Sequence, residues 1–206
     1  MSVSRNTEML KQVGLKNKDL IGIPWRVAFA LQERGWYLRQ DIIWSKPNPM
    51  PESVKDRCTK SHEYLFLLSK SARYLFNSDQ IKEDAVTNND GHRFGGNKYT
   101  ETKDDLFRTK GSIYQSDGKR NKRSVWVVNT KPFKGAHFAV MPEALVEPCV
   151  LAGSNPNDLV LDPFAGSGTV GVVSLRHNRR FVGCELNPEY AAIAHNRIGP
   201  LLSEVK

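Results

Sequence analysis

One run of residues in the last third of the chain has the composition of a ligand-binding turn. Residues 159–171 read Leu-Val-Leu-Asp-Pro-Phe-Ala-Gly-Ser-Gly-Thr-Val-Gly, which predicts a buried strand, a tight turn and a helix that begins directly after it. Gly166 and Gly168 allow backbone conformations and a close ligand approach that a side chain would obstruct. The first N–H groups of a helix have no partner within it and can donate to a ligand. We therefore expect a ligand at this turn.

An acidic residue follows the turn at a distance that suits a nucleoside. The next predicted strand ends at Glu185, which lies 19 residues after Gly166. A carboxylate about 20 residues beyond such a turn accepts hydrogen bonds from ribose hydroxyls. The run from Gly166 to Gly171 also satisfies Gly-x-Gly-x-x-Gly, so a nicotinamide dinucleotide is one candidate. Only 21 residues follow Glu185, so the further strands of a dinucleotide fold would have to come from upstream.

Apolar periodicity and turn residues predict the elements that position this turn. Helices are expected over 21–35, 142–152, 168–177 and 188–198, and strands over 36–44, 63–68, 74–76, 159–161 and 181–184. Three prolines prevent both helix and central strand between residues 46 and 51, which predicts an extended loop there. The succession of strand, helix, strand and helix near the C-terminus is typical of a parallel α/β sheet.

A polar segment over residues 77–123 interrupts this pattern. Nine of its 47 residues are apolar, so it cannot build much core and is expected to be a surface insertion or a loop that orders on a partner. The segment ends in a basic run, namely Lys119, Arg120, Asn121, Lys122 and Arg123. Such a run is commonly a solvated surface, and contact with phosphates is the alternative.

The charge of the chain is unevenly distributed. The net charge is +8, of which residues 1–60 carry +5, residues 61–134 carry +5 and residues 135–206 carry −2. Clustered Lys and Arg side chains release counterions when they bind a phosphate backbone. The first two-thirds are therefore predicted to bind a polyanion, and a merely soluble basic surface is the alternative.

Several protein classes do not fit the sequence. No stretch approaches the roughly 20 apolar residues that a bilayer span needs, and Arg5, Glu8 and Lys11 stand where a secretory signal would be apolar. The three cysteines are far apart and form no Cys-x-x-Cys pair, which favours neither a disulfide framework nor a zinc site. We expect a cytoplasmic protein with no membrane span and no metal.

Five segments resemble the DNA amino-methyltransferases, which methylate N6 of adenine or N4 of cytosine. The run Asp162-Pro-Phe-Ala-Gly-Ser-Gly-Thr169 is similar to their S-adenosylmethionine loop, and residues 181–190 are similar to their ribose-binding strand and the helix after it. Residues 137–143, 42–51 and 61–70 resemble segments of the beta class, in which the cofactor loop lies near the C-terminus. The resemblance implies a class I S-adenosylmethionine-dependent methyltransferase sheet, circularly permuted, in a single domain over residues 1–206.

The resemblance also implies site residues and partners. The cofactor S-adenosylmethionine would be bound by Asp162, Phe164, Ala165, Gly166, Ser167, Gly168, Thr169, Glu185 and His137. Double-stranded DNA would be bound by Lys46, Lys119, Arg120, Lys122 and Arg123, with residues 77–123 as the target-recognition region. The expected setting is a restriction-modification system or a phage.

One departure from the family concerns catalysis. The family's catalytic motif is Asp, Ser or Asn followed by Pro-Pro and an aromatic residue, and the 11 prolines of this chain include no Pro-Pro pair. The run Asn187-Pro188-Glu189-Tyr190 imitates the motif, but a helix cap and a proline in the first turn explain it. No catalytic residue is assigned, and the chain is expected to lack the N-terminal strand that carries the motif. A non-catalytic DNA-binding remnant of such an enzyme is an alternative.

Overall fold

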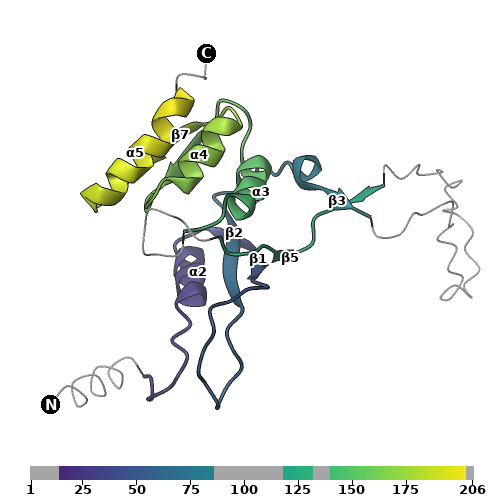
Figure 1. Cartoon of the computed structure of the whole chain (residues 1–206). Coiled ribbons are helices and arrows are strands. Elements are labelled where there is room, and N and C mark those ends of the chain that lie inside the picture. The colour runs from purple at the N-terminus through teal and green to yellow at the C-terminus, as the bar shows by residue number, and fades with distance from the viewer. Residues whose placement is uncertain (1–13, 86–117, 132–139, 203–206) are drawn as a thin grey trace, which may run out of the picture. The chain divides into compact units, whose positions relative to one another are not determined.

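The structure is a computed structural model that describes residues 14–85, 118–131 and 140–202 (Figure 1). The chain divides into two compact units. The first, called here the N-terminal unit, comprises Met1–Tyr74 and Ser124–Thr130, and the second, the C-terminal unit, comprises Leu75–Arg123 and Lys131–Lys206. Each unit is described by itself. Among the described helices, none is both long and apolar enough to cross a membrane.

The described part of the N-terminal unit is a three-stranded sheet with one helix. Its elements are α2 (Ile23–Glu33), β1 (Tyr37–Ser45), β2 (His62–Ser69) and β5 (Val125–Val127). Strand β1 is central, pairing antiparallel with β2 and parallel with β5. Trp44 and Trp126 are buried at the β1–β5 pair, and the indole N–H of Trp44 donates to the Val128 carbonyl at 2.8 Å. Trp25 of α2 packs edge-on against Phe66 of β2 at 4.9 Å between ring centroids.

The C-terminal unit carries the glycine-rich turn. Its elements are η1 (Ser78–Ile81), β3 (Glu83–Asp84), β4 (Lys119–Arg120), α3 (Glu143–Gly153), β6 (Leu159–Asp162), α4 (Thr169–Arg176), β7 (Arg180–Gly183) and α5 (Pro188–Leu202). Strands β6 and β7 are parallel, as the alternating pattern predicts, and β3 pairs antiparallel with β4. Helix α4 packs against both α3 and α5 (Figure 1). The core lies between α3 and α4, where Leu145, Val146, Val150, Val172 and Val173 are buried.

Two glycines allow the elements around α4 to approach closely. Gly168 caps α4 with φ +79°, and a Cβ built there would lie 2.9 Å from the Cβ of Ala194 on α5. A Cβ on Gly171 would lie 2.6 Å from Ile198 and 2.7 Å from Phe181. These separations are below any normal carbon contact, so α5 can reach α4 and β7 only because both positions lack a side chain.

The expected helices and most of the strands are present, with three corrections. Tyr74–Phe76 is not a strand, because the chain there leads to Asn77, whose N–H donates to the Ala152 carbonyl of α3 at 2.8 Å. Helix α5 does not stop at residue 198 but continues through Gly199 and Pro200 to Leu202. The physical reason is that Gly199 does not adopt the positive φ that ends a helix at glycine.

The third correction concerns burial of β6. Helix α4 covers one face of β6 and β7, and Phe181 packs on that side against Gly171. On the opposite face Leu159 and Leu161 are 56% and 61% exposed, and Val182 beside them is 46% exposed. In the described part of the C-terminal unit, β6 is therefore covered on one face only, whereas the sequence predicts a buried strand.

The structure describes both ends of the polar insertion, whereas its residues 86–117 lie outside the described residues. The described residues at its start form η1 and β3, and those at its end form β4. Glu83 lies opposite Arg120, and Asp84 lies opposite Lys119. The two described ends of the insertion therefore lie side by side.

Candidate functional site

The turn between β6 and α4 is fixed by its own backbone. The Asp162 carboxylate accepts the N–H of Phe164 at 3.0 Å, and the Ala165 carbonyl accepts the N–H of Gly168 at 2.8 Å. Gly166 and Gly168 have φ of +53° and +79°, a region that strains any residue with a Cβ. The glycine turn expected from the sequence is therefore present, and α4 begins directly after it.

The turn is joined to the end of β7. The N–H of Cys184 donates to the Asp162 carbonyl, and the N–H of Ala165 donates to the Cys184 carbonyl, both at 2.9 Å. Parallel strands present their carboxyl ends at one edge of a sheet, and these two bonds connect the segments that leave that edge. As a result Glu185 lies beside Gly166, although it comes 19 positions later in the chain.

The Glu185 carboxylate is held as an anion against the turn. One oxygen accepts the N–H of Asn187 at 2.9 Å, and the other accepts the N–H of Gly166 at 2.8 Å. These backbone bonds, that of Asn187 first and that of Gly166 second, lower the pKa of Glu185 below its ordinary value. A carboxylate oxygen can accept two hydrogen bonds. Glu185 therefore keeps capacity to accept hydroxyl groups of a ligand.

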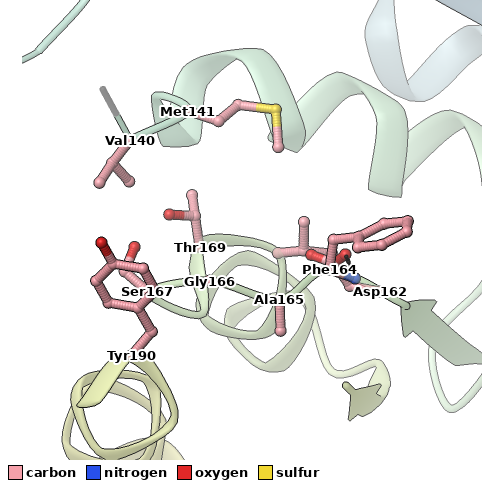
Figure 2. Close-up of a pocket in the computed structure, with 10 residues that line it drawn as sticks. Val140, Met141, Asp162, Phe164, Ala165, Gly166, Ser167, Thr169 and Tyr190 are labelled. Carbon is pink, nitrogen blue, oxygen red and sulfur yellow. Dashed lines mark hydrogen bonds between the residues drawn. The ribbon is translucent and has the colours of Figure 1, made fainter. Parts of the chain in front are cut away.

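A cavity of about 220 Å³ lies against the turn (Figure 2). Its described lining is Val140, Met141, Asp162, Phe164, Ala165, Gly166, Ser167, Thr169, Val170 and Tyr190. In Figure 2, Phe164 and Asp162 lie at one end, and Val140, Ser167 and Tyr190 lie at the other. The Phe164 ring is among the most exposed apolar groups, at 87%. A second hollow of about 420 Å³ shares Val140, Met141 and Thr169 with the first and is also bordered by Arg197.

The structure brings most of the predicted cofactor residues together. Asp162, Phe164, Ala165, Gly166, Ser167 and Thr169 line the cavity, Gly168 starts α4 behind it, and Glu185 is bonded to Gly166. His137 lies outside the described residues. The cap interpretation of the motif-like run is confirmed, since the Asn187 side chain accepts the N–H of Glu189 at 2.9 Å and Pro188 starts α5.

Several lining residues were not singled out from the sequence. Val140 and Met141 precede α3, while Tyr190 and Arg197 lie on α5. Tyr190 and Arg197 are seven residues apart, which places them on one helix face, and that spacing is a signal that could have identified them. Val140 and Met141 lie in the segment 137–143 that resembles the family, and this resemblance is the signal that could have identified them.

The basic run at β4 is partly neutralised. The Arg120 and Arg123 side chains donate to one Glu83 oxygen at 2.9 and 2.6 Å. Burial acts to raise the pKa of Glu83, but hydrogen bonding and charge from Arg123 and then Arg120 outweigh it and hold the pKa below its ordinary value. The run therefore exposes less net positive charge than its sequence indicates. Contact of these residues with DNA stays a prediction.

Lys46 of the N-terminal unit is similarly engaged. Its ammonium pairs with the Glu63 carboxylate and lies 4.3 Å from the centroid of the Trp44 ring. The side chain is only 18% exposed. Lys46 borders a polar hollow of about 320 Å³, which is also lined by Pro24, Glu52, Lys60, His62, Glu63 and Tyr64. Its contact with DNA also stays a prediction.

Comparison with known families decides the class of protein. A family model described as DNA methylase, for N6 and N4 methylation, matches residues 3–196. The chain belongs to this DNA methylase family. The match covers both units and includes the glycine turn, so it decides against the nicotinamide alternative for this site.

The DNA methylase family includes type II methyltransferases that resemble this chain. M.Cfr9I of Citrobacter freundii is 55% identical over 185 residues, and M.SmaI of Serratia marcescens is 52% identical over 185 residues. Each alignment covers 90% of this chain but 52% and 54% of the respective relative. The chain thus spans about half the length of the curated relatives it matches.

Solved structures of DNA methylases share the fold. The M1.HpyAVI–SAM complex matches with a TM-score of 0.59 and 25% identity, covering 87% of this chain and 71% of that one. The PvuII DNA methyltransferase, described as cytosine-N4-specific, matches with a TM-score of 0.60 at 19% identity, covering 88% and 62%. The expected mixed α/β methyltransferase fold is confirmed.

Proposed function

We propose that this chain forms the cofactor-binding part of a DNA amino-methyltransferase. The reaction transfers a methyl group from S-adenosylmethionine to an exocyclic amino group, N4 of cytosine or N6 of adenine, in double-stranded DNA. The observation that carries the proposal is the Glu185 carboxylate, fixed by the N–H groups of Gly166 and Asn187 beside the cavity. Membership of the DNA methylase family supports it.

The residues present fit S-adenosylmethionine. Glu185 offers acceptor oxygens for ribose hydroxyls, and the exposed Phe164 ring offers an apolar surface for a base. Val140 and Met141 add apolar side chains to the cavity lining. When bound, this cofactor supplies a methyl group on a positively charged sulfur, an electrophile that a nitrogen can attack. Two structures similar to this one, those of M1.HpyAVI and of a putative DNA modification methylase from Thermus thermophilus, are complexes with this cofactor.

We further propose a permuted sheet whose base-gripping segment lies outside these 206 residues. The lone pair of an amino group on a base is delocalised into the ring, so the group must be gripped and oriented before it attacks. The family's Pro-Pro-aromatic motif would do this, and the chain contains no Pro-Pro pair. The coverage of about half of M.Cfr9I and M.SmaI supports this proposal. Positioning of this kind is worth up to about 7–11 kcal/mol.

Calorimetry of cofactor binding tests the site. In the Glu185→Ala variant, S-adenosylmethionine should bind about 10-fold to 100-fold more weakly, because ribose hydroxyls lose a charged acceptor. Glu189→Ala is the matched control, since Glu189 is an exposed carboxylate four positions later, in the first turn of α5. Equal affinity in the parent and the Glu185 variant would remove Glu185 from the site.

Methyl transfer tests the catalytic part of the proposal. Tritiated methyl transfer to mixed-sequence DNA should be negligible with the chain alone. It should appear when a segment bearing Pro-Pro-Tyr or Pro-Pro-Phe from a type II relative is fused upstream or supplied as a second chain. Turnover by the chain alone near about 1 per second would show that another set of residues grips the base. No turnover with any such segment would favour the non-catalytic DNA-binding alternative.

A further inference from the structure

A guanidinium lies behind the glycine turn and contacts both of its hydroxyl side chains. Nη1 of Arg197, on α5, lies 2.8 Å from the Ser167 carbonyl oxygen, 3.0 Å from Ser167 Oγ and 3.3 Å from Thr169 Oγ1. The Arg197 side chain is 21% exposed, and Ser167 and Thr169 are 9% and 5% exposed. The three groups thus form a largely buried polar cluster at the cavity wall.

The chemistry of arginine fixes the direction of these hydrogen bonds. A guanidinium carries only donors, so both hydroxyl oxygens must act as acceptors toward it. Each hydroxyl hydrogen then has to point to an acceptor other than Arg197. Because Ser167 and Thr169 both line the cavity, a ligand in the cavity meets two hydroxyl donors backed by a positive charge.

A second set of contacts holds the guanidinium in this orientation. Nη2 of Arg197 lies 3.4 Å from Glu143 Oε1 on α3, and the other oxygen of Glu143 pairs with Arg176 on α4. Arg197 is therefore oriented from two sides, by the turn in front and by Glu143 behind. The planar guanidinium of arginine, with donors on both sides, suits contacts in two directions better than the ammonium of a lysine would.

Two parts of the site consequently differ in polarity. Glu185 offers only acceptors beside Gly166, whereas Ser167 and Thr169 offer donors next to the second hollow that Arg197 borders. A ligand that has hydroxyl donors in one part and an anionic acceptor in another therefore fits in one orientation, with its hydroxyls at Glu185 and its anion at Ser167 and Thr169. S-adenosylmethionine has ribose hydroxyls and, at its amino-acid end, a carboxylate.

We propose that Arg197 is a positioning residue that presents the Ser167 and Thr169 hydroxyls as donors to the carboxylate of the cofactor's amino-acid end. The proposal rests on the function proposed above. It assigns Arg197 no contact with the cofactor and no part in the methyl transfer itself. Arg197 acts through the two hydroxyls, so its loss should affect only ligands that carry the carboxylate.

The test compares two ligands by calorimetry on the full chain. 5′-Methylthioadenosine has the same base and ribose as S-adenosylmethionine but no amino-acid end. Arg197→Gln should weaken S-adenosylmethionine binding at least about tenfold and change methylthioadenosine binding less than about twofold. Thr169→Val, which removes one hydroxyl at constant shape, should show the same selectivity. Arg180→Gln, which removes an exposed guanidinium at the start of β7 that donates to the Asn157 carbonyl, is the matched control and should change neither affinity.

The outcomes separate this proposal from the function on which it rests. Equal weakening of both ligands by Arg197→Gln, with an unchanged melting temperature, would show that Arg197 only shapes the turn and would overturn the proposal. Unchanged S-adenosylmethionine affinity would overturn it as well. A parent chain that binds methylthioadenosine but not S-adenosylmethionine would refute the carboxylate site, while a parent that binds neither ligand would refute the proposed function itself.

Discussion

The close approach of α5 to α4 gives a prediction whose size follows from the structure. In Gly168→Ala the new methyl group must adopt φ near +79°, which costs about 1–2 kcal/mol for a residue with a Cβ. It must also lie 2.9 Å from Ala194 Cβ and 3.1 Å from both Ala194 Cα and Ile198 Cδ1. Overpacking of this kind costs about 1–3 kcal/mol, so together the two effects predict a loss of about 2–5 kcal/mol.

Gly166→Ala provides the matched control within the same turn. Gly166 also has a positive φ, +53°, but a Cβ there meets nothing nearer than the Phe164 carbonyl oxygen at 4.0 Å. Only the backbone cost of about 1–2 kcal/mol should therefore appear. Amide hydrogen exchange of peptides from α4 and α5 measures the loss locally, which matters in a chain of two units. Equal losses of protection in the two variants would refute the close packing of α5 on α4.

Three further predictions concern charge and connectivity. The pKa of Glu185 is lower in the folded than in the unfolded chain, so the ionised carboxylate stabilises the fold above about pH 4.5, and this stabilisation is lost as the pH falls below that value. The free energies of unfolding of the parent and of Glu185→Gln, measured in urea, should therefore converge below about pH 4.5. Glu83→Gln should release Arg120 and Arg123 and steepen the salt dependence of DNA binding, measured by fluorescence anisotropy, by about 0.9 per added phosphate contact; an unchanged slope would remove the basic run from the interface. Asn77→Ala should destabilise the C-terminal unit by about 1–3 kcal/mol in urea, because the Asn77 side chain donates to the Ser154 carbonyl at 3.0 Å; no change would show that this contact is dispensable.

Local pattern was sufficient for the elements that hold the cofactor turn. The apolar run before Asp162, the glycines after it and the cap at Asn187 are all short-range signals, and the structure has β6, α4 and α5 where they predict them. The proximity of Glu185 to Gly166 was also predictable, since the ends of adjacent parallel strands meet at one edge. The family resemblance and the spacing pointed to the same residues.

Features that depend on tertiary contacts were not predictable. The continuation of α5 through Pro200, the exposure of Leu161 and the role of Tyr190 in the cavity wall depend on which elements pack together. The pairing of Arg120 with Glu83 is another case, because the two residues lie 37 positions apart and the intervening sequence carries no signal that brings them together. A run of charges in a sequence does not reveal the counter-charges that face it.

The pairing of β3 with β4 also has a consequence for how members of the DNA methylase family can diversify. Because the two strands lie side by side, the chain between Asp84 and Lys119 departs from and returns to nearly the same place. A replacement of different length at that position costs little in closure entropy and leaves the glycine turn and Glu185 in their own elements. A change in the segment between these two strands would therefore alter one part of the chain without changing the elements that form the glycine turn.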